Sequence, residues 1–249
     1  MSAALPTVPV LHSEWLKIRS LRGTFGALIA VFVATAGTQA LASAAVGQAE
    51  AGALGEDPLL GAFYGINFGQ IAAFTFGASA LAAEFHNGAL RTTLTSVPNR
   101  TRFYLSKIAM VGALAFLVGQ VTGLLTFVLG QVFMGRYALS LGDPGALRAV
   151  FGSGVYLTLM ALFAAGLTAV LRSAAIVLSV LIPFVVMAPF IIGQAAGGAA
   201  EFLPDQAGQL VLRLESTGRL GPWSGLGVLA LWAAAALAAG WLAVRRRDA

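Results

Sequence analysis

The sequence predicts an all-α integral membrane protein, with an amphipathic interfacial helix at the N-terminus followed by six transmembrane helices. Composition is the first reason: 58% of the 249 residues are apolar and only 10% are charged. A soluble domain carries about a quarter charged residues. The second reason is a mean hydropathy of +0.85. The third is that charge-free stretches long enough to cross about 30 Å of hydrocarbon recur along the chain.

Residues 1–23 are expected to form a cytoplasmic N-terminus that contains the interfacial helix. Apolar side chains recur there at i, i+4 and i+7, which places them on one face of a helix. The stripe would rest at the lipid headgroups while the basic side chains meet anionic lipid. The stripe consists of Leu11, Trp15 and Ile18, and Glu14, Lys17 and Arg19 lie off it.

Residues 24–249 are expected to form one transmembrane domain with six helices. Each expected span is close to the length that a bilayer requires, and none contains Asp, Glu, Lys or Arg. The expected spans are residues 24–46, 63–83, 108–134, 150–171, 174–195 and 223–244.

Six crossings would leave both termini on one side, and the basic residues indicate which side that is. Eleven of the 15 Lys and Arg residues fall on the terminal side, so both termini are expected to be cytoplasmic in a multi-pass protein of the cell membrane. The pI near 10.2 then reflects topology and requires no nucleic-acid partner. These eleven are Lys17, Arg19, Arg22, Arg91, Arg100, Arg102, Lys107, Arg172, Arg245, Arg246 and Arg247.

The residues that several classes of membrane protein and enzyme require are absent from the places where they would be needed in this chain. No expected span has an ionisable residue, which disfavours an ion-gradient carrier. With no Cys, and with His12 and His86 both on the cytoplasmic side, we expect no catalytic residues, no metal site and no bound cofactor. The two lysines, Lys17 and Lys107, are not part of a phosphate-binding loop, so ATP would have to be hydrolysed by another subunit.

Uncharged polar side chains mark candidate inward faces of the second and third spans. Exposure of amides to lipid is costly, so these faces either line a substrate pathway or make ordinary interhelical hydrogen bonds. Both interpretations remain open from the sequence. The candidate pathway residues are Asn67, Gln70 and Phe74 in the second span and Gln120 and Gln131 in the third.

Glycines at four-residue spacing predict close helix packing. Gly61, Gly65 and Gly69 form one such series, and Gly119 and Gly123 form another. This spacing lets two helix backbones approach in lipid.

The loop between the second and third spans predicts a short helix over residues 89–96. Leu90 and Leu94 are one turn apart, Arg91 would point outward, and Pro98 would end the helix. The apolar side could dock into another protein. A solvated positive loop is the equal alternative.

The order of these features resembles the type-2 ABC transporter permease family over nearly the whole chain. The similarity consists of Ser13-Glu14-Trp15-Leu16-Lys17-Ile18-Arg19-Ser20, then Glu84, then Gly88-Ala89-Leu90-Arg91-Thr92-Thr93-Leu94, then Pro98-Asn99-Arg100 and Lys107, with the spans in the corresponding order. The most specific part is the first cytoplasmic loop.

The resemblance implies a non-enzymatic permease subunit that pairs with a second copy or a paralogue. It further implies a separate ABC-type ATPase subunit that holds ATP and magnesium, and export of a hydrophobic or amphipathic compound such as a drug, peptide or lipid. Residues 9–22 match the family's elbow helix, residues 89–96 its coupling helix, and residues 197–222 an extracellular segment before the last span. The implied ATPase-contact residues are Glu84, Gly88, Leu90, Arg91, Leu94, Pro98 and Arg100, and the implied elbow residues are Leu11, Trp15, Lys17, Ile18 and Arg19.

An ATP-independent membrane carrier or a membrane scaffold protein is the alternative. The two hypotheses differ in whether the loop helix binds an ATPase. The substrate and the choice between homodimer and heterodimer do not follow from the residues.

Overall fold

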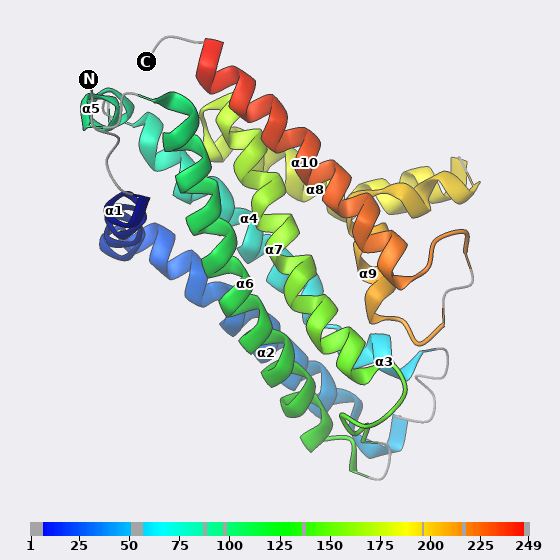
Figure 1. Ribbon diagram of the computed structural model, residues 1–249. Coiled ribbons are helices and arrows are strands. Elements are labelled where there is room, and N and C mark those ends of the chain that lie inside the picture. Colours follow the sequence, from blue (N-terminus) through cyan, green and yellow to red (C-terminus); the bar gives the residue numbers. More distant parts are fainter. Residues whose placement is uncertain are drawn as a thin grey trace.

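Long helices lie side by side in a bundle in the computed structural model (Figure 1). The structure describes residues 7–50, 57–86, 89–96, 99–135, 138–195, 197–215 and 218–246, and the regular secondary structure within these ranges is entirely helical. The long helices of the bundle are α2 (Arg22–Glu50), α4 (Ile66–Ala82), α6 (Arg100–Val132), α7 (Ala146–Leu171) and α10 (Pro222–Arg246). A further long helix, α8 (Ala174–Ala195), contacts α4 and α7 and runs out to one side of the bundle (Figure 1).

Short helices gather at the two ends of this bundle. At one end, called the α5 end, lie α1 (Thr7–Ser20), η1 (Ala83–Phe85), α5 (Ala89–Ser96) and the last turn of α10 (Figure 1). Toward the other end, called the α3 end, lie α3 (Pro58–Gly61), α9 (Pro204–Gln209), η4 (Leu210–Leu212) and the start of α7. A further short helix, η3 (Gly197–Phe202), connects α8 to α9.

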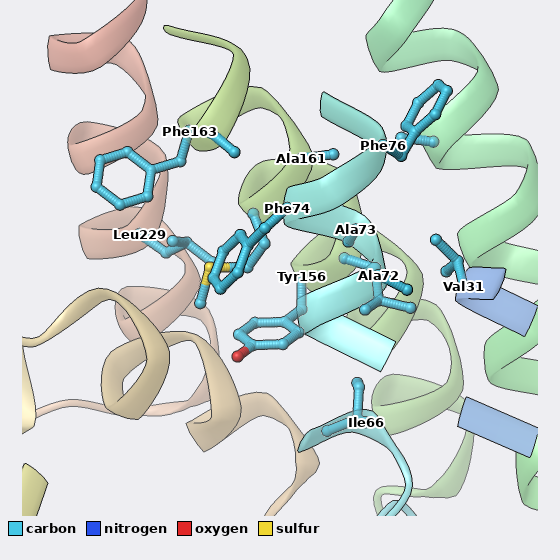
Figure 2. Close-up of a cluster of buried hydrophobic side chains, with 14 of the residues drawn as sticks. Val31, Ile66, Ala72, Ala73, Phe74, Phe76, Tyr156, Ala161, Phe163 and Leu229 are labelled. Atoms are coloured by element: carbon cyan, nitrogen blue, oxygen red, sulfur yellow. The ribbon is translucent and has the colours of Figure 1, made fainter. Parts of the chain in front are cut away.

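Helix α7 forms the centre of the bundle and packs against α4, α6 and α10. Phe74 of α4 and Tyr156 of α7 are both fully buried between these helices, with Leu229 of α10 beside them (Figure 2). Close approach depends on small residues: a Cβ added to Gly77 of α4 would lie 2.0 Å from the carbonyl oxygen of Ala161. The contacts of α7 with its neighbours therefore depend on side-chain packing and on small residues at the helix interfaces.

The glycine series also lies at helix contacts. A Cβ on Gly65 or Gly69 would collide with Thr35 of α2, whereas Gly61 has open space around it. Gly119 and Gly123 of α6 face Gly154 and Ser153 of α7. Both series therefore mark close packing, except at Gly61.

Local signals explain where several helices begin and end. The Asn99 side chain accepts a hydrogen bond of 3.1 Å from the Arg102 N–H and caps α6, and Asp57 caps α3 ahead of Pro58. Gly145 precedes α7 at φ 82°, a left-handed conformation that glycine adopts without steric cost. Arg172 ends α7 at φ 56°, so α8 starts two residues later in a new direction.

Five helices are long and apolar enough to cross a membrane among the described residues, so the prediction of a multi-pass α-helical protein is confirmed at that level. They correspond to α2, α4 with η1, α6, α7 and α10. Helix α8 forms over residues 174–195 as expected, but its described apolar stretch, Ala174–Met187, is shorter than a span requires. The sixth crossing therefore stays a prediction, as does the orientation of the termini.

The third expected span begins earlier than predicted. Helix α6 starts at Arg100 rather than at residue 108, because Asn99 caps it there and because Lys107 is accommodated inside the helix. With 33 residues, α6 is about 50 Å long. The first two turns of α6 lie at the α5 end of the bundle (Figure 1).

Candidate functional site

Four charged side chains meet at the α5 end and form what we call the four-charge cluster: Glu14, Lys17, Glu84 and Lys107. Glu14 and Lys17 are three residues apart on α1 and share one face, with Lys17 Nζ 2.9 Å from Glu14 Oε1. Glu84 comes from η1, at the end of α4, and Lys107 comes from α6. Lys107 Nζ lies 2.7 Å from Glu84 Oε1 and 2.7 Å from Glu14 Oε2, and Lys17 Nζ lies 3.1 Å from Glu84 Oε1.

The cluster is almost completely removed from water on three of its four members. The Lys107 side chain is 1% exposed and the two glutamates are each 3% exposed, while Lys17 is 35% exposed at the rim. Lys107 donates a hydrogen bond to Glu84, whereas its contact with Glu14 is an ion pair without hydrogen-bond geometry. Two carboxylates and two ammonium groups balance, which is the condition under which buried charges are tolerated.

The electrostatics of Lys17 reflect this pairing. Burial lowers the pKa of Lys17, but the hydrogen bond to Glu14 and the charges of Glu84 and Glu14 outweigh burial and leave the pKa above its ordinary value. Lys17 therefore stays charged at neutral pH and holds the two carboxylates together from the solvent side.

Helix α5 is tied into this cluster through Thr93. Lys17 Nζ donates to Thr93 Oγ1 at 3.3 Å, and the Thr93 hydroxyl donates to Glu84 Oε2 at 3.2 Å. The loop helix is thus bonded both to α1 and to the end of α4. A displacement of α5 would have to break or carry these bonds.

Apolar packing fixes the same helix from its other side. Leu90 of α5 is 6% exposed and belongs to a small core with Leu81, Phe103 and Val244, and Leu94 packs against that core. The helix over residues 89–96 is confirmed, and Arg91 is exposed as expected. Side chains of this chain itself cover Leu90, and the contact of the apolar side of this helix with another protein stays a prediction.

The elbow residues are arranged differently from the predicted stripe. Residues 9–20 lie within α1, with Ile18 buried, Trp15 half-buried and Arg19 exposed. Glu14, expected off the apolar stripe, is 2% exposed and faces inward beside Ile18, one turn away. The inward face of α1 is therefore mixed, because Lys107 offers a buried partner that the periodicity of α1 alone does not reveal.

Of the remaining residues expected at this end, Arg100 makes a described contact, whereas others lie outside the described residues. The Arg100 guanidinium donates a hydrogen bond of 3.1 Å to the Val244 carbonyl, which joins the start of α6 to the last turn of α10. Arg245 lies over the Trp241 ring at 4.7 Å in that same turn. Gly88, Pro98 and the side chain of Leu11 lie outside the described residues.

The candidate pathway residues do not share one surface. Asn67 and Gln70 belong to a chain of hydrogen bonds, here called the amide–tyrosine chain: Gln209 Nε2 lies 3.2 Å from Asn67 Oδ1 and 3.4 Å from the Tyr156 hydroxyl, which donates to Gln70. Phe74 is fully buried in the core (Figure 2).

The two glutamines of α6 bind backbone groups within the chain. Gln120 donates to the Phe151 carbonyl at 3.1 Å, and Gln131 Oε1 accepts from the Leu139 N–H at 2.8 Å. For these two residues the structure supplies the interhelical and local hydrogen bonds of the alternative interpretation.

Sequence reasoning missed the partners that make both polar groupings. The positive-inside rule treats Lys107 as a topology signal, although an apolar stretch follows it directly and Phe103, Tyr104 and Leu105 precede it, a setting that indicates a helix interior. Glu14 and Glu84 are two of the few acidic residues on the basic side, which was a signal for pairing. Thr93, Tyr156 and Gln209 carried no signal, since only the fold brings them to their partners.

A scan against models of protein families finds no match to this chain, and a search of curated proteins finds no match either. The assignment of function therefore depends on the residues and geometry described above.

Proposed function

We propose that this chain is the membrane-spanning permease subunit of an ATP-driven ABC transporter, coupled through α5 to a separate ATPase subunit. The observation that carries the proposal is the four-charge cluster, together with its bond to Thr93. It joins the loop helix α5 and the surface helix α1 to the ends of two long apolar helices, α4 and α6. A subunit that receives force at its surface needs such a junction to move its membrane helices.

The coupling works as a chain of rigid contacts. Thr93 connects α5 to Glu84 at the end of α4, and Glu84 is paired with Lys107, two turns into α6. Leu90 anchors α5 in the apolar core that also contains Val244 of α10. A push on α5 by closing ATPase subunits is expected to tilt α4, α6 and α10 together.

The exposed face of α5 is polar. Arg91, Thr92 and Thr95 are exposed on the helix surface, while Leu90 faces inward. We therefore assign the ATPase contact to this polar face and not to the leucines. Glu84 and Arg100 support the contact from within the chain by holding η1 and the start of α6 in place.

Orientation, assembly and cargo complete the proposal. The basic residues of the α5 end favour a cytoplasmic location for it, with both termini on that side of the cell membrane. α1 would lie at the lipid headgroups with Arg19 toward solvent. The chain would pair with a second copy or a paralogue and export a hydrophobic or amphipathic compound.

Affinity purification of the solubilised chain from its native host, followed by mass spectrometry, tests the proposal. The wild-type chain is expected to recover a soluble protein with a phosphate-binding loop. The double variant Arg91→Glu/Thr92→Glu, which changes the exposed face of α5 and leaves Leu90 intact, is expected to lose it. The double variant Arg19→Glu/Ser20→Glu is the matched control, since both residues are exposed on α1 at the same end.

The outcomes separate the alternatives. Loss of the ATPase in the α5 variant but not in the α1 control supports coupling through α5. Recovery of the ATPase with both variants contradicts the assigned surface. Recovery of no ATPase from the wild-type chain, under conditions that preserve a known ABC complex, contradicts the permease proposal and favours a carrier or scaffold.

A further inference from the structure

A ligand-sized hollow opens at the α3 end, far from the four-charge cluster. Its volume is about 650 Å³, within the range of about 300–1,000 Å³ typical of small-molecule sites. One wall comes from α3 and the start of α4, and the other from Gln209 and the segment 213–215 that follows η4. We call it the α3–η4 hollow.

The two walls are fixed to each other by Asp57. Asp57 Oδ1 caps α3 by accepting from the Leu59 and Leu60 N–H groups at 3.1 Å each. Asp57 Oδ2 accepts from the Leu214 N–H on the opposite wall at 2.9 Å. Asp57 is therefore a structural group whose hydrogen bonds connect the two walls of the hollow.

Other charged and polar side chains line the hollow with both signs of charge. Arg213 supplies a guanidinium group, and Glu215, which is exposed, supplies a carboxylate. The amides of Asn67, on the first wall, and Gln209, on the second, lie 3.2 Å from each other. An arginine fork suits the oxygens of a phosphate, while a carboxylate suits an ammonium group.

An aromatic and aliphatic border continues the hollow onto the outer surface of the bundle. Tyr64, in the turn between α3 and α4, lines the hollow with an exposed side chain, and its ring lies 6.3 Å from that of Phe68, which is exposed in the first turn of α4. Leu60 and Leu214 add apolar surface to the lining. A ligand with a charged head and an apolar chain would satisfy both regions, whereas a fully polar solute would leave the border uncovered.

We propose that the α3–η4 hollow binds the headgroup of a zwitterionic phospholipid. Arg213 binds the phosphate, Glu215 and the Tyr64 ring bind the ammonium group, and the acyl chains run along Tyr64 and Phe68. This site is independent of ATPase coupling, because it lies at the opposite end of the bundle. Failure of one proposal leaves the other standing.

Lipid titration of the purified full chain in detergent, followed by native mass spectrometry, tests this site. The probes are phosphatidylethanolamine and phosphatidylglycerol with the same acyl chains, together with chainless glycerophosphoethanolamine. Phosphatidylethanolamine is expected to bind best. Arg213→Gln is expected to weaken its binding about tenfold, the loss typical of one charge-assisted hydrogen bond. The main-chain carbonyl of Arg213, which accepts from Arg148, is unchanged by this substitution.

Two further variants keep the test decisive. Glu215→Gln, at an exposed side chain, is expected to fold normally and to reduce the preference for phosphatidylethanolamine over phosphatidylglycerol. Arg219→Gln, an exposed arginine outside the hollow, is the matched control and is expected to bind like wild type. Three results would each overturn the proposal. The first is equal binding of the two lipids by the wild-type chain. The second is lipid binding by Arg213→Gln and Glu215→Gln that equals that of the wild type, and the third is binding of the chainless headgroup as tight as that of the full lipid.

Discussion

Lys107 and Glu84 form an ion pair of 2.7 Å between side chains that are 1% and 3% exposed, and this pair joins α6 to the end of α4. Removal of one partner from a buried pair leaves an uncompensated charge. Lys107→Met should lower the free energy of unfolding by about 3 kcal/mol, because Glu14 and Glu84 would share a nearly dry site with Lys17 alone. Thermal unfolding in detergent, monitored by tryptophan fluorescence, measures the change.

The matched control for that variant is Lys17→Met at the exposed rim of the same cluster. Its side chain is 35% exposed, so solvent already screens its interactions with Glu14 and Glu84, and the expected loss is about 1 kcal/mol. Equal losses for the two lysines would contradict the view that burial decides the cost.

Alkaline pH should remove the contribution of Lys17. Its pKa in the folded protein is raised above the ordinary value of 10.5, since pairing with Glu14 and Glu84 outweighs burial. A raised pKa gives stability that is fully present below pH 10.5 and is lost as pH rises through the folded value. The difference in melting temperature between wild type and Lys17→Gln should be constant from pH 7 to about 10 and shrink above it. A difference that grows toward high pH would be inconsistent with the raised pKa.

Asp205→Asn is expected to stabilise the fold at neutral pH. Asp205 of α9 is buried, and no described residue makes a hydrogen bond to its Oδ1, while Gln206 donates to Oδ2 at 2.9 Å. Burial raises its pKa despite the Gln206 bonds, so ionisation in the folded state costs free energy that falls away as pH is lowered. Melting temperatures of the variant and the wild type should converge under acid conditions.

Glu201→Gln, in the neighbouring helix η3, is expected to change stability in the opposite direction to Asp205→Asn. The Glu201 carboxylate accepts hydrogen bonds from the Arg219 and Leu220 N–H groups at 3.1 and 2.6 Å, and its negative charge strengthens both bonds. Loss of that charge should lower the melting temperature at neutral pH. A stabilised Glu201→Gln would show that hydrogen bonding does not distinguish the two carboxylates.

Gly77→Ala should destabilise the contact between α4 and α7. The new Cβ would lie 2.0 Å from the Ala161 carbonyl oxygen, so the two backbones would have to separate, at a cost of about 1–3 kcal/mol. Gly26→Ala on α2 is the control, because nothing lies within 4 Å of its added Cβ. Thermal unfolding should rank Gly77→Ala well below wild type, with Gly26→Ala equal to it or slightly above.

The long helices could be predicted because their signal is local. Charge-free stretches of spanning length correspond to α2, α4, α6, α7 and α10, and the spacing of Leu90 and Leu94 predicts α5. The start of α6 could not be placed, because a rule that ends spans at charged residues treats Lys107 as a boundary. A lysine stays inside a helix when distant residues neutralise it, and only the fold brings Glu14 and Glu84 to it.

The candidate site was predictable in its location but not in its chemistry. The elbow helix and loop helix were expected at one end, yet no spacing rule relates Thr93 to Lys17, which is 76 positions away. The burial of Leu90 within this chain could not be predicted, because a two-turn amphipathic helix shows an apolar side without showing what covers it. The amide–tyrosine chain was missed for the same reason, since Gln209 and Asn67 are 142 positions apart.

The balance of two positive and two negative groups in the four-charge cluster has an electrical consequence. Moving one elementary charge through a membrane voltage of 100 mV involves about 2.3 kcal/mol of work, whereas moving a neutral assembly involves none. A shift of the four-charge cluster itself would therefore move no net charge. Lys107→Met would leave a net negative charge in the cluster, so the same shift would then carry charge.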